Sequence, residues 1–400
     1  MKLKGSAFIW VCFAMCVGVM GTALISPLYP LYQQAWQLKT SEISLIYVVY
    51  MMGALCGLLF MGRLSNTLGF RKVMLLGLGL GWIGSVGSML AWEMVLLNSA
   101  RFIVGLASSL IVTSASIGLT QVAKEGASQR ISMISSFLIA FGFGIGPVIG
   151  GVFGQWLPYP LIFAYVPAVI LNAIAFYALA RVDLGQTQAA AFKPRKLRLN
   201  DVLPKLAWTA KRDALGFALT CMCPFFAFGV FGLYASMAPL FLDKMVPWHG
   251  PIVVGSAIGV ILLMSSLVQL LCYRLRVRWC GLIGLWLMAL SNGLLIANFS
   301  LNLTSVFIVG VVAAAAGHGL SLLAGITMVN HIAQPEERAG LLSTYLVSGY
   351  VGSIVPMIGL GWIADHYGLP TAITVFGSGV MLIAIPVGIW FAYHRRMRSA

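Results

Sequence analysis

Twelve apolar runs, each long enough to cross a bilayer as a helix, constrain this chain more than any other feature. A hydrocarbon core about 30 Å thick takes roughly 20 residues of helix, because every backbone N–H and C=O must be satisfied within the segment. The sequence therefore predicts an all-α membrane protein with twelve transmembrane helices. The runs cover residues 8–33, 42–61, 73–92, 94–119, 131–156, 160–181, 214–242, 250–273, 279–299, 303–331, 340–363 and 370–393.

The polar intervals between these runs leave no room for a soluble domain. Hydrophobic residues make up 60% of the chain and charged residues 9%, whereas about a quarter of a soluble globular chain is charged. The first run is too long for a secretory signal and lacks a small-residue cleavage site, so we expect a retained helix. The longest polar interval predicts a cytoplasmic linker at 182–213 between six-helix bundles at 1–181 and 214–400.

The distribution of Lys and Arg predicts the topology. With a cytoplasmic N-terminus, 22 of the 25 basic residues lie inside, Lys39 and Lys244 lie outside, and Arg101 lies within a helix. This asymmetry predicts that both termini are cytoplasmic, and we expect a bacterial cytoplasmic (inner) membrane. The inside residues are Lys2, Lys4, Arg63, Arg71, Lys72, Lys124, Arg130, Arg181, Lys193, Arg195, Lys196, Arg198, Lys205, Lys211, Arg212, Arg274, Arg276, Arg278, Arg338, Arg395, Arg396 and Arg398.

These basic loops also account for the net charge of +15. They hold the orientation and contact anionic lipid head groups. Nucleic-acid binding would need a soluble basic face, which the chain lacks.

Short sequences recur between the two predicted bundles. A carrier built of two such bundles encloses a cavity near the bilayer midplane, and rocking of one bundle against the other opens the cavity to alternate sides. The repeats therefore predict a solute carrier that works by alternating access. They pair 102–105 with 307–310, 26–29 with 238–241 and 147–150 with 356–359, at offsets of 205, 212 and 209.

The loop GRLSNTLGFRK at 62–72 resembles the G-x-L-a-D-R-x-G-R-R/K motif of the major facilitator superfamily, with Gly62, Gly69 and Arg71 in place. The resemblance covers the whole chain and implies the two-bundle fold of that family. In the family the motif's acid helps latch the cytoplasmic side, and here Asn66 replaces it. We expect a weaker latch, because a charged hydrogen bond is about twice as strong as a neutral one. The alternative is a basic loop that serves topology alone.

The fifth predicted helix contains Gly146, Pro147, Gly150 and Gly151, which is similar to the G-P-x-x-G-G signature of drug and metabolite antiporters. Small residues let neighbouring helices approach closely, and proline removes one backbone donor and bends the helix. Helix packing alone would also explain the glycines. The resemblance implies antiporter ancestry.

Two further patterns favour the twelve-helix drug/metabolite:proton antiporter branch. The fourth helix carries Leu97, Arg101 and Gly105 at the spacing of the family's L-x-x-x-R-x-x-q-G motif. The first carries Pro27 and Pro30, like the P-x-x-P of that branch.

Arg101 is the only Lys or Arg well inside a predicted span, roughly 10 Å from its outer end. A charge at that depth costs at least a few kcal/mol and is rarely kept without a role. Arg101 is therefore predicted to be a counter-ion for an anionic solute or a modulator of a proton site. The alternative is that it bonds to carbonyls of the first helix near the outer interface.

His318 lies near the middle of the tenth helix between two glycines. A histidine titrates near neutral pH when unperturbed, so protonation coupled to rocking is one prediction and a structural histidine is the other. The acids lie in loops or at helix ends, so coupling would use His318 or an acid such as Glu42 or Asp365, or be absent. The ten acids are Glu42, Glu93, Glu125, Asp183, Asp201, Asp213, Asp243, Glu336, Glu337 and Asp365.

Tyrosines of the inner helices are the candidate cavity walls, because tyrosine offers an aromatic face and a hydroxyl to amphiphilic solutes. Tyr29, Tyr234 and Tyr345 are the principal candidates, although aromatic residues also gather at the membrane interface. The seven cysteines indicate no disulfide, and packing explains them better than a metal or redox site.

These features predict a secondary transporter that exports small amphiphilic or weakly anionic compounds by proton antiport. The alternative is an importer of one organic anion, and a receptor or sensor is disfavoured. No nucleotide-binding, HExxH or nucleophile-elbow motif appears, so the sequence predicts neither an enzyme nor a cofactor. We expect a monomer whose partners are a small-molecule substrate, protons and lipid.

Overall fold

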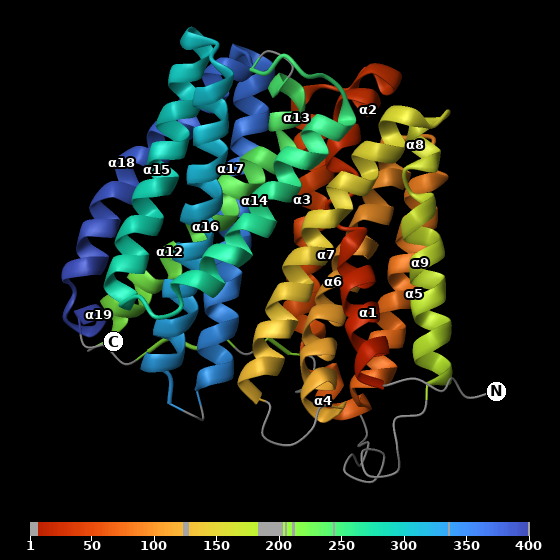
Figure 1. Cartoon of the computed structure of the whole chain (residues 1–400), viewed down its shortest axis with the longest axis horizontal. Helices are drawn as coiled ribbons and strands as arrows, with labels where there is room; N and C mark the ends of the chain where they lie inside the picture. Colours follow the sequence, from red (N-terminus) through yellow and green to blue (C-terminus); the bar gives the residue numbers. More distant parts are fainter. Residues whose placement is uncertain are drawn as a thin grey trace. The chain divides into compact units, whose positions relative to one another are not determined.

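A computed structural model describes residues 7–122, 128–182, 203–204, 206–209, 213–242, 245–334 and 337–398. Every element in these residues is a helix (Figure 1). Eleven helices are long and apolar enough to cross a membrane, and the shorter apolar helix Ala7–Met20 lies in the first predicted run. The predicted all-α membrane fold is therefore confirmed.

The described residues form two compact units. Unit 1 takes its residues from 1–28 and 49–204, and unit 2 from 29–48 and 205–400. The division into bundles at 182–213 stays a prediction. Unit 1 contains α1 (Ala7–Met20), η1 (Ser26–Leu28), the second part of α3 (Thr40–Cys56), the π-helical η2 (Gly57–Met61), α4 (Leu64–Leu68), α5 (Phe70–Met89), α6 (Met94–Val122), α7 (Ser128–Trp156), α8 (Pro160–Phe163) and α9 (Val166–Arg181).

Unit 2 is built around α12 and α15. Helix α12 packs against α17, and α15 packs against α16 and α18. Its elements are α2 (Tyr29–Trp36), the first part of α3, α12 (Ala214–Ser236), α13 (Ala238–Phe241), α14 (Pro251–Cys272), α15 (Val277–Leu301), α16 (Thr304–Ile332), α17 (Arg338–Tyr367), α18 (Leu369–Tyr393) and α19 (Arg395–Arg398).

The prediction of one continuous first helix over 8–33 is wrong. Helix α1 ends at Met20, turns occupy residues 21–25, and η1 and α2 follow. The prolines explain the break, because Pro27 and Pro30 have no N–H for the carbonyls one turn earlier. The N–H of Ser26 bonds instead to the carbonyl of Ala23, three residues back, at 3.1 Å.

The predicted seventh helix over 214–242 is also interrupted. Helix α12 ends at Ser236, and the four residues of α13 follow, with Pro239 at their start. The tetrapeptides 26–29 and 238–241, paired as repeats in the sequence, both stand at such breaks. The resemblance between them therefore marks a shared local structure.

Glycines of α7 lie directly on the backbone of the first helix. A Cβ on Gly142 would overlap the carbonyl oxygen of Cys16, one on Gly146 that of Met20, and one on Gly150 that of Leu24. This spacing of four residues on both helices brings the backbones of α7 and of residues 16–24 into contact, as small residues allow in membranes. Pro147 and Gly151 are buried within α7, which continues through the proline without interruption.

The corresponding helix pair of unit 2 packs differently. A Cβ on Gly352 of α17 would overlap the carbonyl oxygen of Phe225 in α12. Gly359, which the repeat pairs with Gly150, has open space around its Cβ position, with nothing within 4 Å. The same sequence pattern therefore makes a close contact in unit 1 and none in unit 2.

Helix α3 takes part in both units. Its first residues lie along α17, where the hydroxyl of Ser44 donates to the carbonyl of Met357 at 2.7 Å and the hydroxyls of Tyr47 and Ser353 are 2.9 Å apart. Its later residues lie on α6, where a Cβ on Gly53 would overlap the carbonyl oxygen of Phe102. The helix therefore has a hydroxyl-bonded part and a glycine-packed part.

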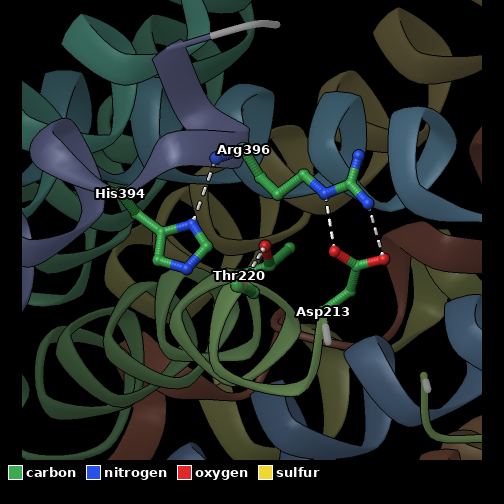
Figure 2. Close-up of polar contacts among 5 residues, drawn as sticks. Asp213, Thr220, His394 and Arg396 are labelled. Carbon is green, nitrogen blue, oxygen red and sulfur yellow. Dashed lines mark hydrogen bonds and ion pairs between the residues drawn. The ribbon is translucent and has the colours of Figure 1, made fainter. Parts of the chain in front are cut away.

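The end of the described chain is tied to the start of α12 (Figure 2). Arg396 of α19 donates from Nε and Nη2 to the two carboxylate oxygens of Asp213, at 2.5 and 2.9 Å. His394 accepts from the backbone N–H of Arg396 at 3.3 Å and lies over Gly216. This bidentate pair fixes α19 against α12.

Part of the predicted charge asymmetry falls outside the described residues, as does most of the predicted linker. The basic residues concerned are Lys2, Lys4, Lys124, Lys193, Arg195, Lys196, Arg198, Lys205, Lys211, Arg212 and Lys244.

Replacing Gly150 by alanine should destabilise the fold, because the added Cβ has to push the first helix away from α7. Overpacking of this kind costs about 1–3 kcal/mol. We expect thermal unfolding of the purified protein in detergent to occur several degrees lower in Gly150→Ala. Gly359→Ala is the matched control and should unfold at or above the wild-type temperature, since alanine favours helix over glycine. Equal melting temperatures for the two variants would refute the packing argument.

Candidate functional site

Arg101 donates hydrogen bonds to the segment in which the first helix is interrupted. Its Nη1 donates to the carbonyl of Gly21 at 3.3 Å, and its Nη2 makes a short bond to the carbonyl of Thr22. Both carbonyls belong to the turns between α1 and η1, where the regular helix bonds are interrupted. The arginine therefore supplies donors to backbone oxygens that a membrane interior would otherwise leave unsatisfied.

Tyr50 completes the surroundings of this guanidinium. The Cζ of Arg101 lies 5.0 Å from the centre of the Tyr50 ring, within the range of a cation–π contact. A Cβ on Gly105 would overlap the carbonyl oxygen of Tyr50. The motif spacing of Arg101 and Gly105 therefore has a structural reason, because the glycine brings α3 close enough for the tyrosine ring to meet the arginine one turn away.

The charge of Arg101 has no counter-charge among the described residues, and no carboxylate there lies within 4.0 Å of it. The residue is 1% exposed, and its Nε has no hydrogen-bond partner among the residues that the structure describes. A buried cation with a donor to spare is chemically suited to an anionic or electron-rich group.

His318 forms a second polar site, in unit 2. Its Nδ1 lies 2.7 Å from the hydroxyl of Ser265 on α14, and the amide of Gln269, one turn further along, donates to the same hydroxyl at 3.4 Å. A Cβ on Gly319 would meet the backbone of Ser265, at 2.5 Å from its carbonyl oxygen. Glycine in this position therefore allows α14 and α16 to approach closely enough for the histidine to reach the serine.

Two phenylalanine rings lie beside the imidazole, and a tyrosine ring packs on one of them. The rings of Phe228 and His318 are stacked with centroids 6.5 Å apart, and Phe231 lies at 5.9 Å. Tyr350 of α17 meets Phe228 edge to face at 5.7 Å. All three residues are half-buried. Nε2 of His318 has no hydrogen bond within the described residues. The group therefore combines aromatic faces with one available imidazole nitrogen.

The three tyrosines proposed as cavity walls lie elsewhere and are buried. Tyr29 is enclosed at the start of α2, and the hydroxyl of Tyr234 lies 3.0 Å from that of Ser291. Tyr345 donates to the carbonyl of Leu322 at 3.4 Å. Within unit 2, the hydroxyls of Tyr234 and Tyr345 therefore bond to neighbouring helices and not to His318.

The loop at 62–72 contains a short helix and one obligatory glycine. Gly69 has φ of +87°, a conformation that favours glycine, and separates α4 from α5. Arg71 donates to the carbonyls of Leu179 and Ala180 at 3.0 and 2.8 Å, so it closes the C-terminal end of α9. A Cβ on Gly62 would lie 2.7 Å from the carbonyl oxygen of Leu58.

Asn66, the residue in the place of the family's acid, lies in α4 with an exposed side chain. Its latch role stays a prediction.

The acids that the structure describes lie at helix ends. Glu42 accepts from the backbone N–H of Lys39 at 2.7 Å and so caps α3. Asp365, near the end of α17, accepts from the backbone N–H of Ser41 at 3.1 Å. The two negative side chains therefore meet the N-terminus of α3, where the helix dipole favours them.

Sequence reasoning missed Phe228, Phe231, Ser265 and Gln269 around His318. A signal was present, because Ser265 and Gln269 are polar residues four apart on one face of an apolar helix. The phenylalanines gave no signal, since an aromatic pair in a membrane helix is ordinary.

Comparison with protein families agrees with this architecture. A family model described as Major Facilitator Superfamily matches residues 11–279 and 247–399. Among characterised proteins, the chain is 25% identical over 399 residues to the multidrug efflux protein YfmO of Bacillus subtilis (strain 168), covering 94% of this chain and 90% of that protein.

A shorter match joins the chain to the riboflavin transporter RibZ of Clostridioides difficile (strain 630). The identity is 22% over 163 residues, which cover 41% of this chain and 36% of that protein. Among solved structures, a POT family transporter in complex with 5-aminolevulinic acid superimposes with a TM-score of 0.73 at 15% identity, covering 96% of this chain and 95% of that one. At such low identity the likeness concerns the fold.

Replacing Arg101 by lysine should lower stability although it keeps the charge. A single ammonium group cannot reproduce the planar fork that serves two carbonyls while resting on the Tyr50 ring. We expect a loss of about 1–3 kcal/mol, the cost of leaving a buried polar group unsatisfied, measured as a lower unfolding temperature in detergent. Arg181→Lys, at an exposed position near the end of α9, is the control and should be neutral; an equal effect there, or none in Arg101→Lys, would contradict the role.

Proposed function

This chain belongs to the major facilitator superfamily and is a secondary transporter rather than an enzyme, and on that premise we propose that it exports small amphiphilic or weakly anionic organic compounds in exchange for protons. One observation carries the proposal: Arg101 is a buried cation without a carboxylate partner among the described residues and keeps an unused Nε donor. An anionic or electron-rich group of a solute completes its bonding.

The direction of transport rests on similarity. The chain resembles a multidrug efflux protein along nearly its whole length, and Gly146 and Gly150 fit the antiporter signature of its branch. The excess of basic residues in alternate loops supports a bacterial inner-membrane location with both termini in the cytoplasm.

His318 is the proposed proton carrier. It is 7% exposed, lies among aromatic rings, and contacts no charged group within the described residues. Ser265 holds Nδ1, so Nε2 is the nitrogen that takes and releases the proton. In the proposed cycle, the bundles at 1–181 and 214–400 rock against each other as His318 takes and releases the proton. The carrier is proposed to function as a monomer.

Expression of the protein in an efflux-deficient bacterium should lower the accumulation of an organic-anion dye severalfold, and a protonophore should restore it. Removal of the guanidinium in Arg101→Gln should abolish the effect, since the anion loses its partner. Arg181→Gln removes an exposed charge and is the control. Dye fluorescence in the cells is the measurement.

Two results would overturn this assignment. Greater dye accumulation that survives in Arg181→Gln and disappears in Arg101→Gln would identify an importer of organic anions. Unchanged export by a well-expressed Arg101→Gln protein would remove the counter-ion role.

The pH dependence of transport should flatten in His318→Gln, because glutamine can keep a hydrogen bond to Ser265 but cannot carry a proton at these pH values. The measurement is dye efflux from proteoliposomes across a series of imposed pH gradients. His366→Gln is the matched control, since His366 is exposed at the end of α17 and bonds to the carbonyl of Trp362. A pH profile unchanged in His318→Gln would exclude it as the proton carrier.

A further inference from the structure

Six arginines gather at one end of unit 2. Two segments supply them: the connection between α14 and α15 together with the first turn of α15, and the short helix α19, which packs against α15. The arginines are Arg274, Arg276, Arg278, Arg395, Arg396 and Arg398.

Packing fixes the two segments together. Met397 of α19 is 1% exposed and shares a hydrophobic cluster with Val277 and Cys280 of α15. The bidentate pair of Arg396 with Asp213 also holds α19, against the start of α12 (Figure 2). These contacts therefore hold the backbone segments that carry the arginines in place.

Five of the six charges have no carboxylate partner among the described residues. Of these six arginines, only Arg396 forms an ion pair within the part of the chain that the structure describes, and Arg278 has a buried Nε without a hydrogen-bond partner there. Like charges held close together repel one another. An anion that bridges them would relieve that repulsion.

Three of the arginines rest on exposed aromatic rings. The Cζ of Arg274 lies 5.3 Å from the ring of Tyr273, that of Arg278 lies 5.1 Å from Trp279, and that of Arg398 lies 5.2 Å from Tyr393.

Tyr273, Trp279 and Tyr393 are exposed residues, at 54%, 44% and 68%. Exposed tyrosine and tryptophan at the ends of membrane helices sit at the level of lipid head groups. The Nε of Arg274 donates to the hydroxyl of Tyr273 at 2.7 Å and that of Arg278 is buried, so the terminal N–H groups of these guanidiniums are the donors left for a phosphate.

Two arginines of unit 1, Arg71 and Arg181, have different surroundings. Arg71 gives its donors to the carbonyls of α9. Arg181 rests on Tyr177, at 5.4 Å, without a comparable arginine cluster. The arrangement in unit 2 is therefore more than the basic loops that topology requires.

We propose that this arginine cluster binds the phosphate of an anionic phospholipid head group. The positive charge and the N–H donors of the arginines fit phosphate. The exposed aromatic side chains beside them fit a lipid at the membrane interface rather than a soluble anion. The site is independent of the direction and substrate of transport.

Native mass spectrometry of the full chain in a non-ionic detergent, titrated with phosphatidylglycerol, tests the proposal. Each arginine near an anionic lipid surface contributes about fivefold in affinity. The doubles Arg274→Gln/Arg276→Gln and Arg395→Gln/Arg398→Gln should therefore each weaken phosphatidylglycerol binding by more than about tenfold. Phosphatidylcholine binding should stay unchanged, and millimolar inorganic phosphate should not displace the lipid. Arg396 is left intact because it anchors α19.

The double Arg63→Gln/Arg181→Gln is the matched control, since it removes the same charge from unit 1. Its affinity for phosphatidylglycerol should remain within about twofold of wild type. An equal loss in the control would reduce the effect to net charge, and unchanged binding in both site doubles would overturn the proposal. Displacement of the lipid by inorganic phosphate would also overturn it, in favour of a soluble anion.

Discussion

A backbone oxygen in hydrocarbon needs a donor, and this requirement governs the centre of unit 1. The first membrane helix stops at Met20, and Arg101 reaches the two carbonyls that follow. The break creates the need for a donor, and the buried charge is tolerated because the break exists. The sequence allowed two interpretations of Arg101, as a functional charge and as a hydrogen-bond partner of carbonyls, and the two are therefore compatible. A guanidinium has five N–H donors, and the carbonyls of the first helix take only part of them.

Close backbone contact at glycines gives the helices around this centre their fixed partners. Without a hydrophobic force between helices in lipid, such contacts and interhelical hydrogen bonds are what hold a bundle together. Gly105 brings Tyr50 to Arg101, and Gly319 brings His318 to Ser265. In both units a small residue positions a polar one, so the packing and the candidate chemistry depend on the same few positions.

The membrane spans could be predicted from the sequence, and the features that the sequence did not predict have physical causes. The twelve apolar runs predicted the spans because hydrocarbon thickness fixes helix length. They did not predict the breaks in the first and seventh helices, since hydrophobicity continues unchanged through the turns at 21–25 and through Met237. Tyr234 was chosen for its residue type alone, and its burial against Ser291 depends on contacts between helices distant in sequence. His318 was found, but its neighbours were not, because an aromatic residue in an apolar helix carries no distinguishing pattern.

Helix α3 has a mechanical consequence for a carrier of this kind. Its first residues belong to unit 2 and its later residues to unit 1, so under the proposed rocking of the bundles this helix has to bend or lose contacts at one end. Water can replace the hydroxyl bonds that join Ser44 and Tyr47 to α17, each worth roughly 1 kcal/mol net. It cannot replace the direct backbone contact at Gly53. The hydroxyl bonds to α17 are therefore the contacts of α3 that can break and re-form more easily, and under the proposed rocking they are the ones we expect to exchange with water.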